Sequence, residues 1–332
     1  PARTASDVEL VQPYRLPTTQ DGLTTFLQMT DHLIAEHQPY LVLLGHEPTG
    51  VYHEPWARAL QAYYAPQLSG QTPLTFEYRF FNPYQVKLAR QQTHLRPRKT
   101  DPRDLAAMYD LMLRGLGQPA FLPTGVDLLL RQEVGFIRAQ SRLLGVLERQ
   151  LRQQIDRLWP GAIVRLQTFR QAHPHLPAPT PIIETHPLQR DRLRVLLSHC
   201  PNPYDLLALS DAQILALYRR EMGRAGPALL RRLRTWGSEA VLPPPELAAP
   251  LADQVQRLFT QYCATETLIE EGRGRLEPLI YRTPARQLPA IPGLGPHDAA
   301  AYWAGLGSVA RFYRAAEVWA FAGFEPIAAG SG

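Results

Sequence analysis

Over the first 120 residues, stretches with apolar residues at helical spacing alternate with short stretches typical of strands. This pattern predicts alternating helices and strands. Leucine and phenylalanine recur at helical spacing over residues 23–33, whereas residues 40–44 form a short apolar run typical of a buried strand. Residues 74–80 alternate between apolar and polar side chains, which predicts a second strand. Further helices are predicted to begin near Glu54, Pro83 and Pro102. This order of elements is typical of an α/β domain, which we place at residues 1–120.

From Asp127 onward the pattern becomes helical only. Apolar residues repeat at steps of three, four or seven from Leu130 to Leu158, with arginines on the other faces, which predicts a long helix of coiled-coil type. A proline-rich stretch at 173–187 ends this helix and leads into a short helical insert. A second long helix at about 247–276 is expected to pair antiparallel with the first. We therefore predict a helical arm with an insert at 121–285 and a small helical domain at 286–332.

The composition narrows the class of protein. Arginine supplies 33 of the 35 cationic side chains, and the net charge is +5. Such a bias suits phosphate binding, although a GC-rich genome would produce the same bias. Two cysteines without paired spacing exclude a disulfide scaffold and a cysteine-based zinc site. No apolar run reaches the roughly 18 residues of a membrane span, and the start lacks a signal-peptide core, so we expect a soluble cytoplasmic protein without a membrane partner.

Three carboxylates form a candidate metal site. Glu47 follows a predicted buried strand, at the sheet edge where α/β proteins place their sites. Asp101 and Asp104 are three residues apart at the start of a predicted helix, so they share one side of its first turn. Oxygen ligands of this kind suit Mg²⁺ and phosphoryl transfer. The alternative is that Asp101 is an N-cap, Asp104 a favourable charge at the helix start and Glu47 a loop acid.

Cationic side chains surround these acids. Between residues 79 and 104, seven cations stand against two aspartates. The predicted nucleic-acid contacts in this stretch are Arg79, Lys87, Arg90, Arg96, Arg98, Lys99 and Arg103. A second basic group, Arg231, Arg232 and Arg234, ends the insert of the arm. Such groups would neutralise phosphates beside a metal, although a solvated surface loop is the alternative.

Two further features near the carboxyl end are candidates for contacts with nucleic acid or for chemistry. Gly293 and Gly295 precede a helix-like stretch at 297–306, where backbone amides and the helix start would hold a phosphate without base recognition. A plain turn between helices is the alternative. Ser331 lies between two glycines, which by itself indicates only a flexible loop.

Taken jointly, the motifs resemble a known family. The segments 45–52 (GHEPTGVY), 82–83 (NP), 98–106 (RKTDPRDLA), 291–295 (IPGLG) and 322–326 (AGFEP) occur in the order and separation of the DEDD transposases of the insertion-sequence family numbered one hundred and ten. The resemblance covers nearly the whole chain. It implies an RNase H-like (RuvC-like) domain, a coiled-coil arm and a carboxy-terminal transposase domain. It also implies a recombinase guided by a bridge RNA that pairs with donor and target double-stranded DNA, assembled as homodimers or homotetramers.

The resemblance also implies roles for individual residues. In that family four acids bind Mg²⁺, and Glu47, Asp101 and Asp104 match the second, third and fourth. Ser331 matches the serine that attacks DNA and forms a covalent phosphoserine intermediate. The strand that carries the first acid should precede Val8, and Asp7 does not match its setting, so we expect that strand and a basic segment after Ser331 to be missing from this chain.

Two other functions stay open. A RuvC-like structure-specific endonuclease would use metal-activated water and need no serine. A catalytically inactive remnant would bind nucleic acid without cutting it, as the expected loss of the first acid would favour. Trapping a covalent adduct separates a recombinase from both.

Overall fold

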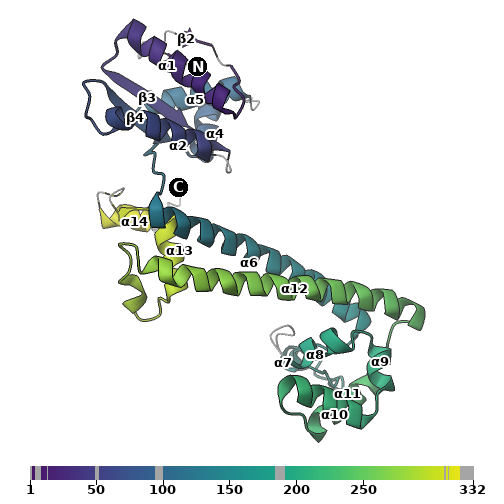
Figure 1. Ribbon diagram of the computed structural model, residues 1–332. Helices are drawn as coiled ribbons and strands as arrows, with labels where there is room; N and C mark the ends of the chain where they lie inside the picture. The colour runs from purple at the N-terminus through teal and green to yellow at the C-terminus, as the bar shows by residue number, and fades with distance from the viewer. Residues whose placement is uncertain are drawn as a thin grey trace. The chain divides into compact units, whose positions relative to one another are not determined.

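The computed structural model describes residues 2–3, 9–12, 14–48, 52–93, 100–183, 191–309, 312 and 314–321. The chain is mostly helical and carries one small mixed sheet and one two-stranded sheet (Figure 1). It divides into two compact units. The first comprises the described parts of 1–124 and 306–332, and the second comprises 125–305. Residues 288–305 thus belong with the arm, and not with the residues that follow them.

A three-stranded sheet forms the centre of the first unit. Strands β3 (Leu41–His46) and β4 (Thr75–Phe80) are parallel and pair in register along their whole length. The short β5 (Gln118–Pro119) runs antiparallel to the end of β4. Both predicted strands are confirmed. A separate antiparallel pair joins β1 (Ala2–Arg3) and β2 (Glu9–Val11).

Helices cover both faces of this sheet. They are α1 (Gln20–His37), α2 (His53–Tyr63), α3 (Ala65–Leu68), α4 (Pro83–Thr93) and α5 (Asp101–Leu113). Phe76 and Tyr78 on one face pack with apolar side chains of α1 and α2. On the other face, Gly45 lies beneath Met112 of α5, and the sheet packs against α4 and α5 around Phe81. The result is an α/β unit of three layers, as the alternating pattern predicts.

Two long antiparallel helices form the arm of the second unit. They are α6 (Gly125–Leu158) and α12 (Pro245–Ile280), which lie side by side (Figure 1). Glu133 near the start of α6 pairs with Arg275 near the end of α12, at 2.8 Å. The last turns of α6 share one apolar core with the first turns of α12. Both predicted long helices and their antiparallel pairing are confirmed.

The insert between the two arm helices is a small helical bundle. Its helices are α7 (Leu166–Ala172), α8 (Asp191–His199), α9 (Pro203–Ala208), α10 (Asp211–Met222) and α11 (Pro227–Glu239). Trp159 and Trp236 stack at its centre with ring centroids 5.1 Å apart. Each buried indole donates its N–H to a backbone carbonyl, of Pro201 at 2.9 Å and of Pro160 at 3.0 Å. These bonds satisfy the only polar atom of each buried ring.

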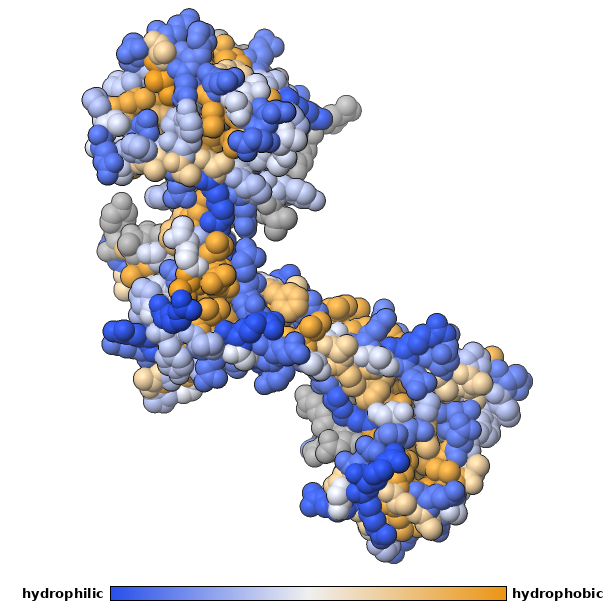
Figure 2. All heavy atoms as spheres, viewed as in Figure 1, coloured by the Kyte–Doolittle hydropathy of each residue, from blue (hydrophilic) through white to orange (hydrophobic). Residues whose placement is uncertain are grey.

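Three short helices follow the arm. They are η1 (Leu288–Ala290), α13 (Pro296–Leu306) and α14 (Ala315–Phe321). Trp303 of α13 donates to Asp127 at the start of α6, at 2.8 Å, so α13 is fastened to the arm. Within the described part of the chain, every helix is too short or too polar to cross a lipid bilayer (Figure 2).

Candidate functional site

Glu47 occupies the predicted position at the carboxyl end of a parallel strand. It directly follows β3 and is half-buried. Beside it, His46 Nδ1 lies 3.3 Å from the Tyr78 hydroxyl. Burial, with a smaller contribution from the nearby His53, lowers the pKa of His46 to about 4. The imidazole next to Glu47 is therefore neutral at physiological pH.

Asp101 and Asp104 lie together in the first turn of α5. The N-cap of α5 is Thr100, and Asp101 is the first helical residue. Asp101 is therefore not the N-cap, which was the alternative to a metal-binding role. The Thr100 carbonyl accepts the Asp104 N–H at 3.1 Å, which closes the first turn. Carboxylates here are stabilised by the partial positive charge of the helix start. Both acids thus lie in the first turn of one helix, Asp101 exposed and Asp104 buried.

Each of these aspartates has an arginine partner. Asp101 Oδ2 lies 2.9 Å from Nη2 of Arg15, and 71% of the aspartate and 92% of the arginine side chain are exposed. Asp104 pairs with Arg90 of α4, and here only 11% and 10% of the side chains are exposed. The first pair is a surface contact of small energetic value, whereas the second is part of the packed interior.

The three acids lie at two elements of the first unit. Across the described residues, which include all three acids, no three histidine, cysteine or acidic side chains are grouped as metal ligands. Asp101 and Asp104 share the first turn of α5, and Glu47 follows the last residue of β3. Their oxygen atoms nevertheless fit Mg²⁺ by chemistry. The magnesium assignment stays a prediction.

The predicted nucleic-acid contacts of the first unit differ in their surroundings. Arg79 donates to Glu77 at 2.7 Å and to the carbonyls of Gly115 and Leu116, so it fastens β4 to the turn before β5. Arg90 is buried against Asp104. Lys87 is exposed on α4, and Arg103 is half-buried on α5. Arg96, Arg98 and Lys99 lie outside the described residues. Their contacts with nucleic acid all stay predictions, but Arg79 and Arg90 already have structural partners.

The turn that contains Gly293 and Gly295 leads directly into the N-terminus of α13. Gly293 has a φ of +86°, which favours glycine, and Gly295 directly precedes α13. The Leu294 amide donates to the Ile291 carbonyl at 3.0 Å and is thus occupied within the turn. A phosphate contact at Gly293 and Gly295 stays a prediction. Ser331 lies outside the described residues.

In the second basic group, as in the first unit, a predicted nucleic-acid contact already has a structural partner. Arg234 donates to the carbonyl of Leu207 at 3.1 Å and to Asp211 at 2.8 Å, so its guanidinium fastens α11 to the α9–α10 corner. Arg231 is exposed on α11, and Arg232 is half-buried there. Residue type alone does not distinguish Arg234 from its neighbours, because its partners Leu207 and Asp211 are more than 20 positions away.

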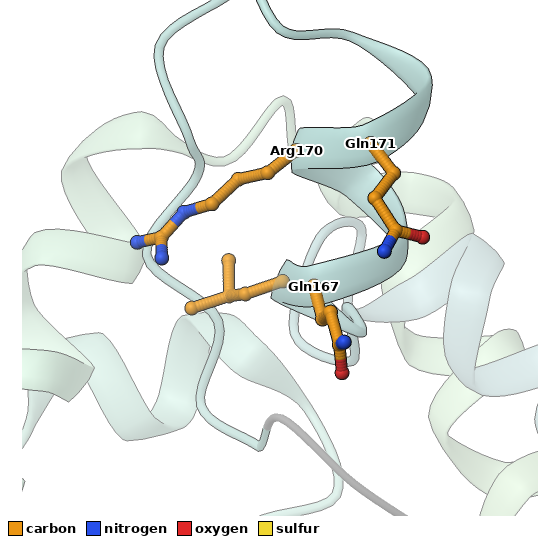
Figure 3. A pocket seen from close by; sticks show the side chains of 4 residues that line it. Gln167, Arg170 and Gln171 are labelled. Atoms are coloured by element: carbon orange, nitrogen blue, oxygen red, sulfur yellow. The ribbon is translucent and has the colours of Figure 1, made fainter.

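A hollow in the surface of the insert lies beside α7. It is lined by Leu166, Gln167, Arg170 and Gln171, all on one short helix. Figure 3 shows Arg170 and Gln171 pointing to opposite sides of that helix. Because these polar groups do not converge, the hollow offers no defined ligand site.

Comparisons with known proteins add no relative. A scan against models of protein families finds no match to this chain, and a search of curated proteins finds none. Function therefore rests on the chain's own residues and on the geometry described above.

Proposed function

We propose that this chain is a DNA recombinase of the transposase type, acting by magnesium-dependent, RNA-guided strand exchange. The observation that carries the proposal is the pair of aspartates in the first turn of α5, packed on a sheet whose parallel strand β3 is directly followed by Glu47. An RNase H-like domain would place its acids on such elements. The order of an α/β unit, an antiparallel arm and a short helical end also fits the family that the motifs resemble.

The reaction requires a nucleophile and stabilisation of a charged phosphate. Attack by the Ser331 hydroxyl on phosphorus would form a phosphoserine ester, release a DNA hydroxyl and conserve bond energy for rejoining. Glu47, Asp101 and Asp104 would hold Mg²⁺, which would stabilise the charge that develops on the phosphate oxygens. Arg15 would release Asp101 at small cost because both side chains are exposed, whereas release of Asp104 by the buried Arg90 would cost more.

Substitution of the acids tests the metal assignment. We expect Glu47→Gln and Asp101→Asn to abolish exchange between labelled donor and target duplexes in the presence of Mg²⁺ and guide RNA, while RNA binding persists. Asp110→Asn is the matched control, since Asp110 lies on the same helix two turns further on. Unchanged recombination by the Glu47 and Asp101 variants would contradict the assignment.

Substitution of the serine tests the nucleophile and separates the alternatives. Ser331→Ala should remove the covalent protein–DNA band from a denaturing gel, and a band that persists would place the nucleophile elsewhere. Cleavage without any covalent band would favour a RuvC-like endonuclease. Binding without cleavage would favour an inactive nucleic-acid-binding remnant, a function that the pairing of both aspartates with arginines also supports.

A further inference from the structure

Helices α10 and α11 of the insert form a helix–turn–helix. Four residues, 223–226, separate them. Gly223 ends α10 with a φ of +69°, and its amide donates to the Arg219 carbonyl at 2.9 Å. Pro227 then occupies the first turn of α11. A short turn with a left-handed glycine between two helices is typical of the DNA-binding motif of this name, whose second helix enters the major groove.

A common core holds the two helices in place. Ile214 and Tyr218 of α10 are buried with Leu229, Leu233 and Trp236 of α11. The Tyr218 hydroxyl donates to the Arg192 carbonyl of α8 at 3.0 Å, which adds a third helix to the unit. With one side fixed in this way, α11 presents a defined opposite side to solvent.

The exposed side of α11 carries small residues and Arg231, and Glu239 is exposed at the last position of the helix. One face of α11 is formed by residues three or four positions apart. They are Pro227, Arg231, Thr235 and Ser238, together with Ala228, which lies three positions before Arg231. All are exposed except Thr235, which is half-buried. The helix therefore exposes a guanidinium with little steric obstruction beside it.

The carboxylates of α10 and α11 already have hydrogen-bond or ion-pair partners. Residues 211–239 contain six arginines and three acids. Asp211 pairs with Arg234 at 2.8 Å, and Glu221 pairs with Arg220 at 2.7 Å. Glu239 accepts the backbone N–H of Thr180 at 3.1 Å. The acids are thus engaged by partners other than Arg231, and the motif retains a positive net charge that suits a polyanion.

The chemistry of this face matches base edges in the major groove. Arginine donates two hydrogen bonds to guanine O6 and N7, the methyl groups of alanine and threonine contact the thymine methyl, and serine bonds to several bases. The major groove is about 12 Å wide, which admits an α-helix. At 13 residues α11 is about 20 Å long, so several of its turns can face the bases.

We propose that the insert is a sequence-selective module for double-stranded DNA, in which α11 enters the major groove and Arg231 contacts a guanine. The module requires no metal, no RNA and no strand exchange. It goes beyond the proposed recombinase, because guide pairing alone would not need a protein element that recognises bases.

Selection from random duplexes tests the proposal on the full chain. The probe is a labelled pool of DNA duplexes with 12 random base pairs, in EDTA and without RNA. We expect repeated selection to enrich a short sequence that contains a guanine. Fluorescence anisotropy should then show at least tenfold tighter binding of the selected duplex than of its scrambled version.

Variants of Arg231 define the contact. Arg231→Ala should weaken binding of the selected duplex by about 5- to 150-fold, the range for one bidentate base contact, and change scrambled-duplex binding far less. Arg231→Lys keeps the charge and should weaken the preference, because lysine lacks the planar fork that fits guanine O6 and N7. Arg170→Ala, which removes an exposed arginine of α7, should keep the preference. Circular dichroism checks that each variant is folded.

Three results would overturn the proposal. They are a pool without an enriched sequence, an unchanged preference in Arg231→Ala, and tighter binding of an RNA hairpin with the selected sequence. Loss of strand exchange in the acid variants leaves this assay untouched, so the two proposals fail independently.

Discussion

Arg90 and Asp104 show how one pair of side chains serves both stability and the proposed chemistry. Among the described charged residues they are the buried ones. Transfer of two charges from water into a protein interior is costly, and their mutual attraction offsets that cost only while both are present. The pair therefore fastens α4 to α5 and fixes Asp104 at the helix start.

Removal of Arg90 should destabilise the first unit strongly. We expect Arg90→Ala to lower its free energy of unfolding by about 3–5 kcal/mol, since Asp104 would be left buried without its partner. Urea denaturation followed by circular dichroism measures the change. Lys87→Ala, at an exposed position of the same helix, should change stability by less than about 0.5 kcal/mol.

A double variant separates lost pairing from lost packing. Arg90→Met with Asp104→Leu places apolar side chains of similar size in the same space, and it should recover most of the stability. A double variant as unstable as Arg90→Ala would contradict this account of the pair.

At the scale of elements, one glycine sets how closely the two arm helices approach. A Cβ atom at Gly272 of α12 would lie 2.7 Å from Cγ1 of Ile137 on α6, closer than real contacts allow. Gly274, two residues further on, has no atom within 4 Å of such a position. The same residue type thus has a packing role at one position and none at the next.

These two glycines should respond oppositely to leucine. Gly272→Leu should lower the free energy of unfolding of the arm by about 1–3 kcal/mol through overpacking. Gly274→Leu should raise it by up to about 0.8 kcal/mol, because leucine favours a helix more than glycine does. Hydrogen exchange of the α6 and α12 amides reports both changes, and equal protection in the two variants would contradict the packing argument.

At the scale of the whole molecule, the chain consists of two units with separate cores. One lies around the sheet, and the other runs from the arm into the insert. A single unfolding free energy does not describe such a protein.

We expect calorimetry to resolve two unfolding transitions. Arg90→Ala should shift the transition of the α/β unit alone, and Gly272→Leu should shift that of the arm alone. One transition that moves as a whole in both variants would show that the units unfold as one.

Sequence patterns predict the periodic elements of this fold and little of its side-chain pairing. β3, β4, α6 and α12 follow from runs and spacings that neighbouring residues determine. Periodicity does not indicate Arg15, because its partner Asp101 is 86 positions away. The sequence predicts Arg90 and Arg234 as nucleic-acid contacts, and it does not show that each has a carboxylate partner in the fold. Periodicity also does not pair α10 with α11, although Gly223 and Pro227 are signals for the short turn between them.

The Trp159–Trp236 stack has a consequence for how the insert is attached to the arm. It joins the start of the insert to its last helix, and Trp236 also bonds to Pro160. Both ends of the insert thus leave the arm at one place, and the pairing of Glu133 with Arg275 lies far along the arm from it. We therefore expect substitutions on the outer face of α11 to leave the Glu133–Arg275 pair of the arm unchanged.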